Sequence, residues 1–152
     1  MSVVQKVKWA GLLLGAMWLA ACSKDPNKYL ASGDKYFKAG KYQEAVIQYR
    51  NAIQLNPKLA QAHYELSRAY FQLKSPAAAY RELRETVTLD PENSDAQLEF
   101  ATLLIGGKKY DEAKAAAAKV LAANPRSSRA HAILGDEFAL TGDWAEIGRA
   151  HV

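Results

Sequence analysis

The sequence has little of what an enzyme or a nucleic-acid-binding protein requires. Its 152 residues include a single cysteine, Cys22, so no disulfide can form within one chain. The 20 basic and 16 acidic residues are spread along the chain, without the basic stripe that nucleic-acid binding needs. It has no HExxH motif, no glycine-rich phosphate loop and no nucleophile beside a base. We therefore expect no enzymatic activity, no metal, no cofactor, no small-molecule substrate and no nucleic-acid partner.

The main feature of the sequence is an internal repeat. Three of the five prolines are 34 residues apart, each after Asn or Asp: Pro57, Pro91 and Pro125. An alanine keeps the same spacing, twelve residues before each of these prolines: Ala45, Ala79 and Ala113. A fixed period of this length indicates a solenoid of stacked structural repeats, in which no unit can bury its apolar face alone.

The N-terminal segment precedes the repeats and has a different character. Lys6 and Lys8 lead into the apolar residues 10–21, a run shorter than the roughly 20 residues that span a bilayer. This order is typical of a secretory signal peptide. Its last residues, Leu-Ala-Ala-Cys at positions 19–22, resemble the bacterial lipobox. The alternative is an ordinary signal peptide with an incidental cysteine, but the only cysteine of the chain falls on the lipobox position.

The resemblance to a lipobox implies a cellular location as well as attachment to a membrane by lipid. Residues 1–21 would be removed as the signal peptide, Cys22 would carry lipid, and residues 22–25 would form a short linker. Ser23, not Asp, follows the cysteine, which resembles the pattern sorted to the outer membrane, facing the periplasm. We expect export followed by lipid anchoring there, and the inner membrane remains an alternative.

Each period reads as two helices and two turns. In the first unit Asp25 suits the N-cap, Pro26 suits the first helical position and Gly40 suits the turn between helices. Ser75-Pro76 and Gly106-Gly107 mark the corresponding turns of the next two units. The predicted units span residues 26–59, 60–93 and 94–127, followed by a partial unit over 128–145.

These residues resemble the tetratricopeptide repeat from residue 26 to about 145. The first helix of each unit carries a small residue at one position: Gly33, Ser67, Ala101 and Gly135. A large residue follows three positions later: Tyr36, Tyr70, Leu104 and Phe138. Ser32, Thr86 and Ala117 depart from the family pattern, which weakens individual packing sites but leaves the period intact. The resemblance implies an all-α solenoid of helix-turn-helix repeats, preceded by the lipoprotein signal peptide.

In this family the first helices line a concave groove that binds protein partners. By repeat position, the partner-binding residues here would be Phe37, Tyr64, Arg68, Phe71, Leu98 and Ile105. Aromatic side chains in a groove are typical anchors for a bound peptide or helix. The alternative for any one of them is packing against an adjacent unit. Leu30, Asp34 and Glu65 stand where family members carry a Lys/Asn clamp for a C-terminal carboxylate, which disfavours recognition of that group.

The histidines repeat with the units. His63 and His131 are two periods apart and occupy the first-helix position that Tyr29 occupies in the first unit. We expect equivalent packing, not metal binding or catalysis, to explain both.

The final seven residues, 146–152, do not follow the repeat pattern. The string Glu-Ile-Gly-Arg-Ala-His-Val resembles the translation of a sequencing adapter. We expect it to be an artefact of a truncated record, with further repeats in the natural chain. An authentic atypical last repeat is the alternative.

Together these features predict a lipid-anchored periplasmic scaffold that binds a protein or peptide partner of the cell envelope. The resemblance points to envelope assembly or export, including exopolysaccharide and protein sorting, pilus assembly or outer-membrane assembly. Two other functions stay open: a docking arm of a larger enzyme, or a structural spacer without a bound client.

Overall fold

The structure is a computed structural model that describes residues 25–141, with side chains described up to residue 135. Within these residues the chain forms seven α-helices and no strand, which confirms the predicted all-α solenoid. None of these helices has both the length and the apolar character that crossing a bilayer needs. Cys22 and the segment 146–152 lie outside the described residues. The helices are α2 (Pro26–Lys38), α3 (Tyr42–Leu55), α4 (Ala60–Gln72), α5 (Pro76–Leu89), α6 (Ser94–Gly106), α7 (Tyr110–Ala123) and α8 (Ser128–Thr141).

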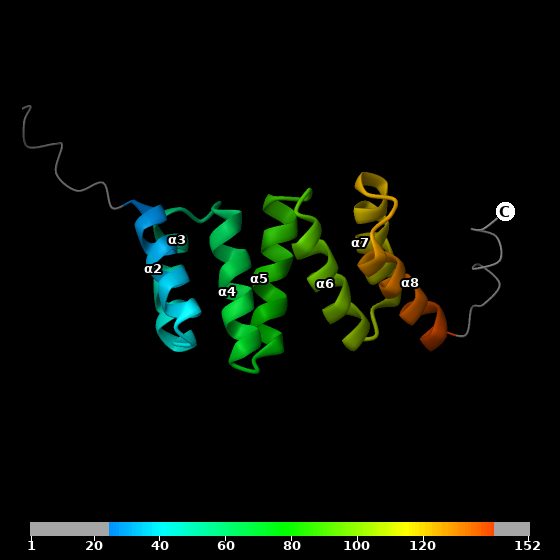
Figure 1. Ribbon diagram of the computed structural model, residues 1–152, viewed down its shortest axis with the longest axis horizontal. Coiled ribbons are helices and arrows are strands. Elements are labelled where there is room, and N and C mark those ends of the chain that lie inside the picture. The colour runs from blue at the N-terminus through cyan, green and yellow to red at the C-terminus, as the bar shows by residue number, and fades with distance from the viewer. Residues whose placement is uncertain (1–24, 142–152) are drawn as a thin grey trace, which may run out of the picture.

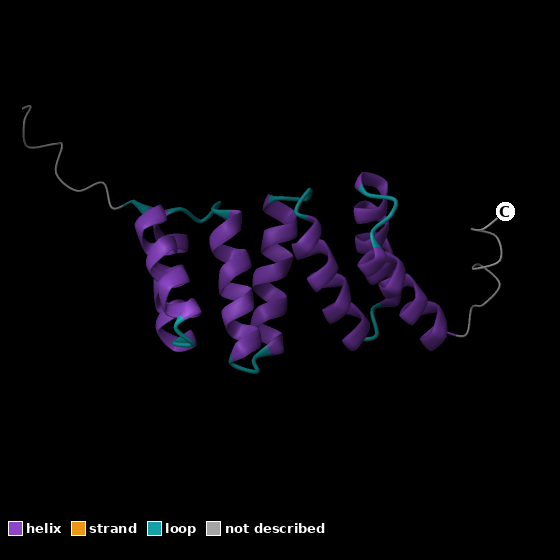
Figure 2. Cartoon of the chain, viewed as in Figure 1, coloured by secondary structure: helices purple, strands orange, loops and turns teal. Residues whose placement is uncertain are grey.

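The helices form a row of antiparallel pairs, α2–α3, α4–α5 and α6–α7, with α8 at the far end (Figure 1). First helices begin at 26, 60, 94 and 128, so the period of 34 residues in the sequence is also the period of the fold. Each helix contacts the next one along the chain, and the first helices also meet directly in the pairs α2–α4 and α6–α8. Short loops join the helices at the two edges of the row (Figure 2).

Side chains cap the N-termini of α2 and α6, whereas α3, α4, α5 and α7 have no side-chain cap. The Asp25 carboxylate accepts the backbone N–H of Asn27 at 2.9 Å, and Asn93 accepts that of Ala96 at 3.0 Å. Ser75 stands at the N-cap of α5, but its hydroxyl donates to the carbonyl of Leu73 at 3.5 Å and caps nothing. Pro76 alone therefore supplies the start signal of α5.

The turn within each unit uses a left-handed residue at one repeat position. Gly40 has φ +72°, and the equivalent residues Lys74 and Lys108 have φ 57° and 60°. In each turn the next N–H bonds to a carbonyl five residues earlier, as from Lys41 to Tyr36 at 2.9 Å. Gly107 has φ −86°, so the glycine pair Gly106-Gly107 does not supply the left-handed residue of its own turn.

The core of the first unit depends on a glycine that faces a tyrosine. Gly33 on α2 is buried, and Tyr49 on α3 is completely buried against it. A Cβ at position 33 would lie 2.6 Å from Tyr49 Cδ1 and closer still to Cε1. The predicted packing of a small residue on one helix against a large one on its neighbour is therefore present here. In the second unit Ser67 and Leu83, both fully buried, occupy the same two positions.

Candidate partner-binding surface

Five of the six predicted partner-binding residues are partly exposed on the first helices. Phe37 lies on α2, Tyr64, Arg68 and Phe71 lie on α4, and Ile105 lies on α6. Tyr64, Arg68 and Phe71 are spaced three and four residues apart, so they share one face of α4. We call these five residues, together with the charged side chains beside them on α2, α4, α6 and α8, the first-helix surface.

Leu98 differs from the sequence expectation. It is 4% exposed and belongs to the apolar cluster formed by α6, α7 and α8, so it offers almost no surface to a partner. The physical reason is that α8 packs directly against α6 at this level, as its neighbours Ala130 and Ile133 in the same cluster show. Ile105 packs against the edge of that cluster but keeps part of its side chain exposed.

Phe71 and Phe37 differ in how firmly the fold holds them. Phe37 packs against the buried cluster of the first two units and meets the Tyr42 ring edge-on, with centroids 5.3 Å apart. Phe71 is partly exposed and belongs to neither of the two buried clusters found in the described part of the chain. An aromatic side chain that the core does not use is available for a partner.

Arg68 is the centre of the first-helix surface. Its guanidinium carbon lies 5.0 Å from the centroid of the Phe37 ring and 5.9 Å from that of Tyr64. Its NH1 donates to the Glu65 carboxylate at 2.9 Å, while 41% of the Arg68 side chain stays exposed. These contacts join α2 to α4, because a guanidinium is attracted to aromatic faces and to carboxylates at once.

Two tyrosines donate hydrogen bonds to carboxylates in the neighbourhood of Arg68. Tyr64 on α4 donates its hydroxyl to Glu99 Oε1 on α6 at 3.0 Å, and Tyr49 donates to Asp34 Oδ1 at 3.0 Å. Burial, followed by the neighbouring carboxylate, raises the pKa of both tyrosines, so both hydroxyls stay protonated and donate. The Tyr64–Glu99 bond links α4 to α6, which ties the second and third units together.

Glu99 has one oxygen that nothing satisfies. Its Oε2 is inaccessible to solvent and has no hydrogen-bond partner, although the residue as a whole is partly exposed. Burial raises the pKa of the Glu99 carboxyl, and Tyr64, Arg68 and Arg129 oppose that shift. A buried acceptor without a donor is costly and therefore marks a place where another group could bind.

The charges of this surface are mainly negative. Asp95 on α6 accepts a hydrogen bond from Arg129 on α8 at 3.0 Å, which joins the third and fourth units. Repeat position predicts Asp34 on the groove and Glu65 at a clamp position, but it does not indicate Glu99. We call the set of six side chains the charged cluster: Asp34, Glu65, Arg68, Asp95, Glu99 and Arg129.

The histidines have a structural role that recurs at the repeat period. His63 Nε2 lies 3.0 Å from the carbonyl oxygen of Pro57, and His131 Nε2 lies 3.0 Å from that of Pro125. In the third unit the amide of Gln97 donates to the carbonyl of Pro91, also at 3.0 Å. In the second, third and fourth units, one first-helix side chain thus holds the loop that precedes it by a hydrogen bond. The two histidines are equivalent in this hydrogen bond but not in packing, because His63 is buried whereas His131 is exposed.

His63 has acceptors on both sides of its ring. Pro57 O can only accept a proton at Nε2, and the Glu82 carboxylate lies 2.8 Å from Nδ1. This carboxylate raises the pKa of His63 above its usual value, against the opposing effect of burial. The geometry therefore favours the doubly protonated ring in the folded state.

This ion pair predicts a pH-dependent stability. Because the folded state binds the His63 proton more tightly than the unfolded state, the stabilisation is complete below about pH 6.5, the pKa of an unperturbed histidine. It decreases as the pH rises through the higher pKa of the folded state. Urea unfolding at pH 6 and pH 8.5 should show this loss in the wild type. Glu82→Gln, whose amide can donate to a neutral ring, should lose less, and an equal loss in both proteins would contradict the assignment.

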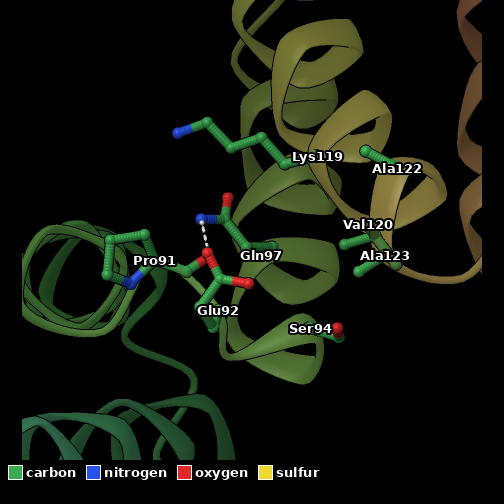
Figure 3. Close-up of a pocket in the computed structure, with 8 residues that line it drawn as sticks. All are labelled: Pro91, Glu92, Ser94, Gln97, Lys119, Val120, Ala122 and Ala123. Carbon is green, nitrogen blue, oxygen red and sulfur yellow. Dashed lines mark hydrogen bonds between the residues drawn. The ribbon is translucent and has the colours of Figure 1, made fainter.

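One hollow in the described part of the chain is lined by small residues of α7. It measures about 440 Å³ and lies between Gln97 on α6 and the end of α7, where Ala122 and Ala123 line it (Figure 3). The equivalent residues are Gln54 and Leu55 in the first unit, where the hollow at this position measures about 110 Å³. The hollow of the third unit is also lined by Pro91 and Glu92 of the loop that precedes α6.

Comparison with known protein families identifies the repeats. A family model described as "TPR repeat" matches residues 33–74, and one described as "Tetratricopeptide repeat" matches residues 71–136. Mouse (Mus musculus) "DnaJ homolog subfamily C member 3" is 30% identical over 101 residues, which are 66% of this chain and 20% of that protein. Soybean (Glycine max) "Hsp70-Hsp90 organizing protein 1" is 31% identical over 81 residues, or 53% of this chain and 14% of that protein. The chain thus spans at most about a fifth of the length of these curated relatives.

Solved structures show the same architecture. The first TPR domain of Spaghetti (RPAP3), bound to the HSP90 peptide SRMEEVD, has a TM-score of 0.71 and 26% identity, covering 80% of this chain and 97% of that one. MamA, at 22% identity, has a TM-score of 0.73 over 82% of this chain and 68% of that one, which shows the shared fold alone. The family matches extend from residue 33 to 136, and the helix pairs follow the same period. The chain therefore belongs to the tetratricopeptide repeat family, whose members serve as protein-interaction domains.

Proposed function

We propose that this protein is a scaffold that binds a protein partner through the first-helix surface. The observation that carries the proposal is the face of α4, where Phe71, Tyr64 and Arg68 are partly exposed side by side. Phe71 packs in neither buried cluster, so its side chain has no evident role in holding the fold. The charged cluster surrounds this face and would orient a bound peptide by polar contacts.

The similar proteins support peptide binding as the mode of action. The RPAP3 domains were solved with short peptides, SRMEEVD of HSP90 and SGPTIEEVD of HSP70. Both peptides are acidic, whereas the first-helix surface here carries four carboxylates in its charged cluster. We therefore propose a shared mode of binding with a different partner.

The site of action follows from the N-terminal segment. We propose that the scaffold lies at the cell envelope, anchored by lipid at Cys22 to the periplasmic face of the outer membrane. There it would assist assembly or export. The supporting features are the lipobox-like residues 19–22 and the start of α2 at Pro26, only a few residues later. More than one acyl chain on the same residue gives stable anchoring.

The anchor is tested by replacing the cysteine. The full chain and its Cys22→Ser variant are expressed in a bacterium with two membranes, and membranes are extracted with alkaline carbonate. We expect the wild type to remain in the outer-membrane fraction and to incorporate labelled palmitate. The variant should lose the label because serine has no thiol to acylate. Palmitate incorporation by the variant, or a wild type that carbonate releases, would disprove the anchor.

The binding surface is tested by a charge on α4. Phe71→Glu should reduce partner recovery in crosslinked pull-downs at least about tenfold, since loss of a buried aromatic anchor costs about 2 kcal/mol or more. Ile47→Glu is the matched control, because Ile47 is a 57% exposed apolar residue on the second helix α3. Circular dichroism should show equal helicity in both variants. An unchanged partner set for Phe71→Glu would refute binding at this surface.

A further inference from the structure

The chemistry of the first-helix surface points to the class of its partner. We propose that it binds a basic peptide segment, with basic side chains of the partner held separately by Glu99 and by Asp34 and an apolar side chain of the partner on Phe71. This inference rests on the proposed function and specifies the occupant of the same surface. Its support comes from charge, from an unmet acceptor and from the aromatic faces, in that order.

The charge balance of the surface favours a cation. The charged cluster contains four carboxylates and two arginines, and both arginines are already paired, Arg68 with Glu65 and Arg129 with Asp95. The other two carboxylates, Asp34 and Glu99, each receive a tyrosine hydroxyl and have no basic side chain in ion-pair contact within the described residues. A tyrosine orients a carboxylate without neutralising it. Arg68 and Arg129 lie near enough to Glu99 to favour its charged form but do not pair with it, so both carboxylates can still accept a cation of the partner.

The unmet acceptor lies at Glu99. Its Oε1 takes the hydroxyl of Tyr64, which fixes the carboxylate beside the α4 face, while Oε2 has neither a donor nor solvent. The residue as a whole is partly exposed, so we infer that its side chain turns on binding to present Oε2 to the partner. An ammonium or guanidinium group from a partner would supply the missing hydrogen bond, and such charge-assisted bonds are stronger than neutral ones.

The aromatic faces already hold a cation within the chain. Arg68 lies over the rings of Phe37 and Tyr64, so the geometry of this surface accommodates a guanidinium between aromatic side chains and carboxylates. Phe71 is one helical turn beyond Arg68 on the same face of α4. A peptide with a basic residue and an apolar residue a few positions apart would match Glu99 and Phe71 together. An acidic peptide would meet like charges at Asp34 and Glu99.

The test uses two labelled peptides that differ only in charge. One probe is a fluorescein-labelled 12-residue peptide of alternating leucine and lysine, with blocked ends, and the other has glutamate in place of lysine. Fluorescence anisotropy with the full chain should show that the lysine probe binds at least about tenfold more tightly than the glutamate probe. Glu99→Gln should reduce that affinity about tenfold, because it removes a charge-assisted bond. Asp111→Asn, an exposed acid in the first turn of α7, should leave it within about twofold.

The outcomes separate this inference from the proposed function. If the glutamate probe binds as tightly as the lysine probe, or if Glu99→Gln and Asp111→Asn behave alike, the basic-partner inference is overturned. Phe71→Glu can still abolish partner recovery in that case, and binding at the surface would stand. If neither probe binds, the inference is overturned as well. A lysine preference that Glu99→Gln removes, and that Phe71→Ala weakens, supports both proposals.

Discussion

Gly33→Ala is expected to destabilise the protein by about 1–3 kcal/mol, although alanine is normally the better helix former. The added methyl group would stand 2.6 Å from Tyr49 Cδ1, well inside van der Waals contact. Tyr49 is completely buried and its hydroxyl is held by Asp34, so the ring cannot move aside without losing both packing and a hydrogen bond. The strain therefore has to separate α2 from α3.

Gly135→Ala is the matched control for this prediction. Gly135 occupies the same repeat position in α8, yet a Cβ there would meet no atom within 4 Å. Its replacement should be neutral or should stabilise the helix by about 0.5–1 kcal/mol. Urea unfolding followed by circular dichroism measures both changes. Midpoints that move in the same direction for the two variants would show that Tyr49 yields easily and that the contact is not tight.

A compensating pair of substitutions tests the same contact from the other side. The second unit places Ser67 and Leu83 where the first unit places Gly33 and Tyr49. Tyr49→Leu should therefore relieve most of the strain of Gly33→Ala, giving the double variant a higher urea midpoint than the single one. Such non-additivity is expected of residues in direct contact.

The period of the fold could be predicted from the sequence because it depends on local signals. Proline after Asn or Asp ends the second helices, and small residues recur where helices approach closely. The left-handed residues at Lys74 and Lys108 could not be identified, because lysine carries no signal for that conformation. Only their equivalence to Gly40, 34 and 68 residues earlier, would have indicated them.

The candidate site was predictable only in part, for a related reason. Repeat position placed Phe37, Tyr64, Arg68, Phe71 and Ile105 correctly on the exposed side of the first helices. Whether they bind a partner is still to be tested. The bonds from Tyr64 to Glu99 and from Arg129 to Asp95 join different units, and they depend on how far each unit rotates relative to the last. No pattern within one repeat encodes that rotation, so these partners appear only in the structure.

The units also differ in how well their helices are filled. The helix α7 buries three alanines, at positions 113, 116 and 117. At the position equivalent to Ala117, α3 and α5 carry the larger residues Tyr49 and Leu83. At this one position α7 therefore buries a smaller side chain than α3 or α5 does. The second unit lies between the first and the third and contacts both, so truncating its large buried side chain should have the largest effect on the whole array.

Leu83→Ala is expected to cost about 2–5 kcal/mol, a large share of the roughly 5–15 kcal/mol that stabilises a typical domain. Leu83 is completely buried on α5, which contacts both α4 of its own unit and α6 of the next. In a linear array each unit is stabilised mainly by its neighbours, so weakening the central unit uncouples the two ends. Urea unfolding should start at a lower concentration and become less steep, because the ends no longer unfold together. Leu55→Ala, at a 38% exposed position of α3, should change the free energy of unfolding by no more than about 0.5 kcal/mol. An equally steep transition for Leu83→Ala would instead mean that the units unfold as one block.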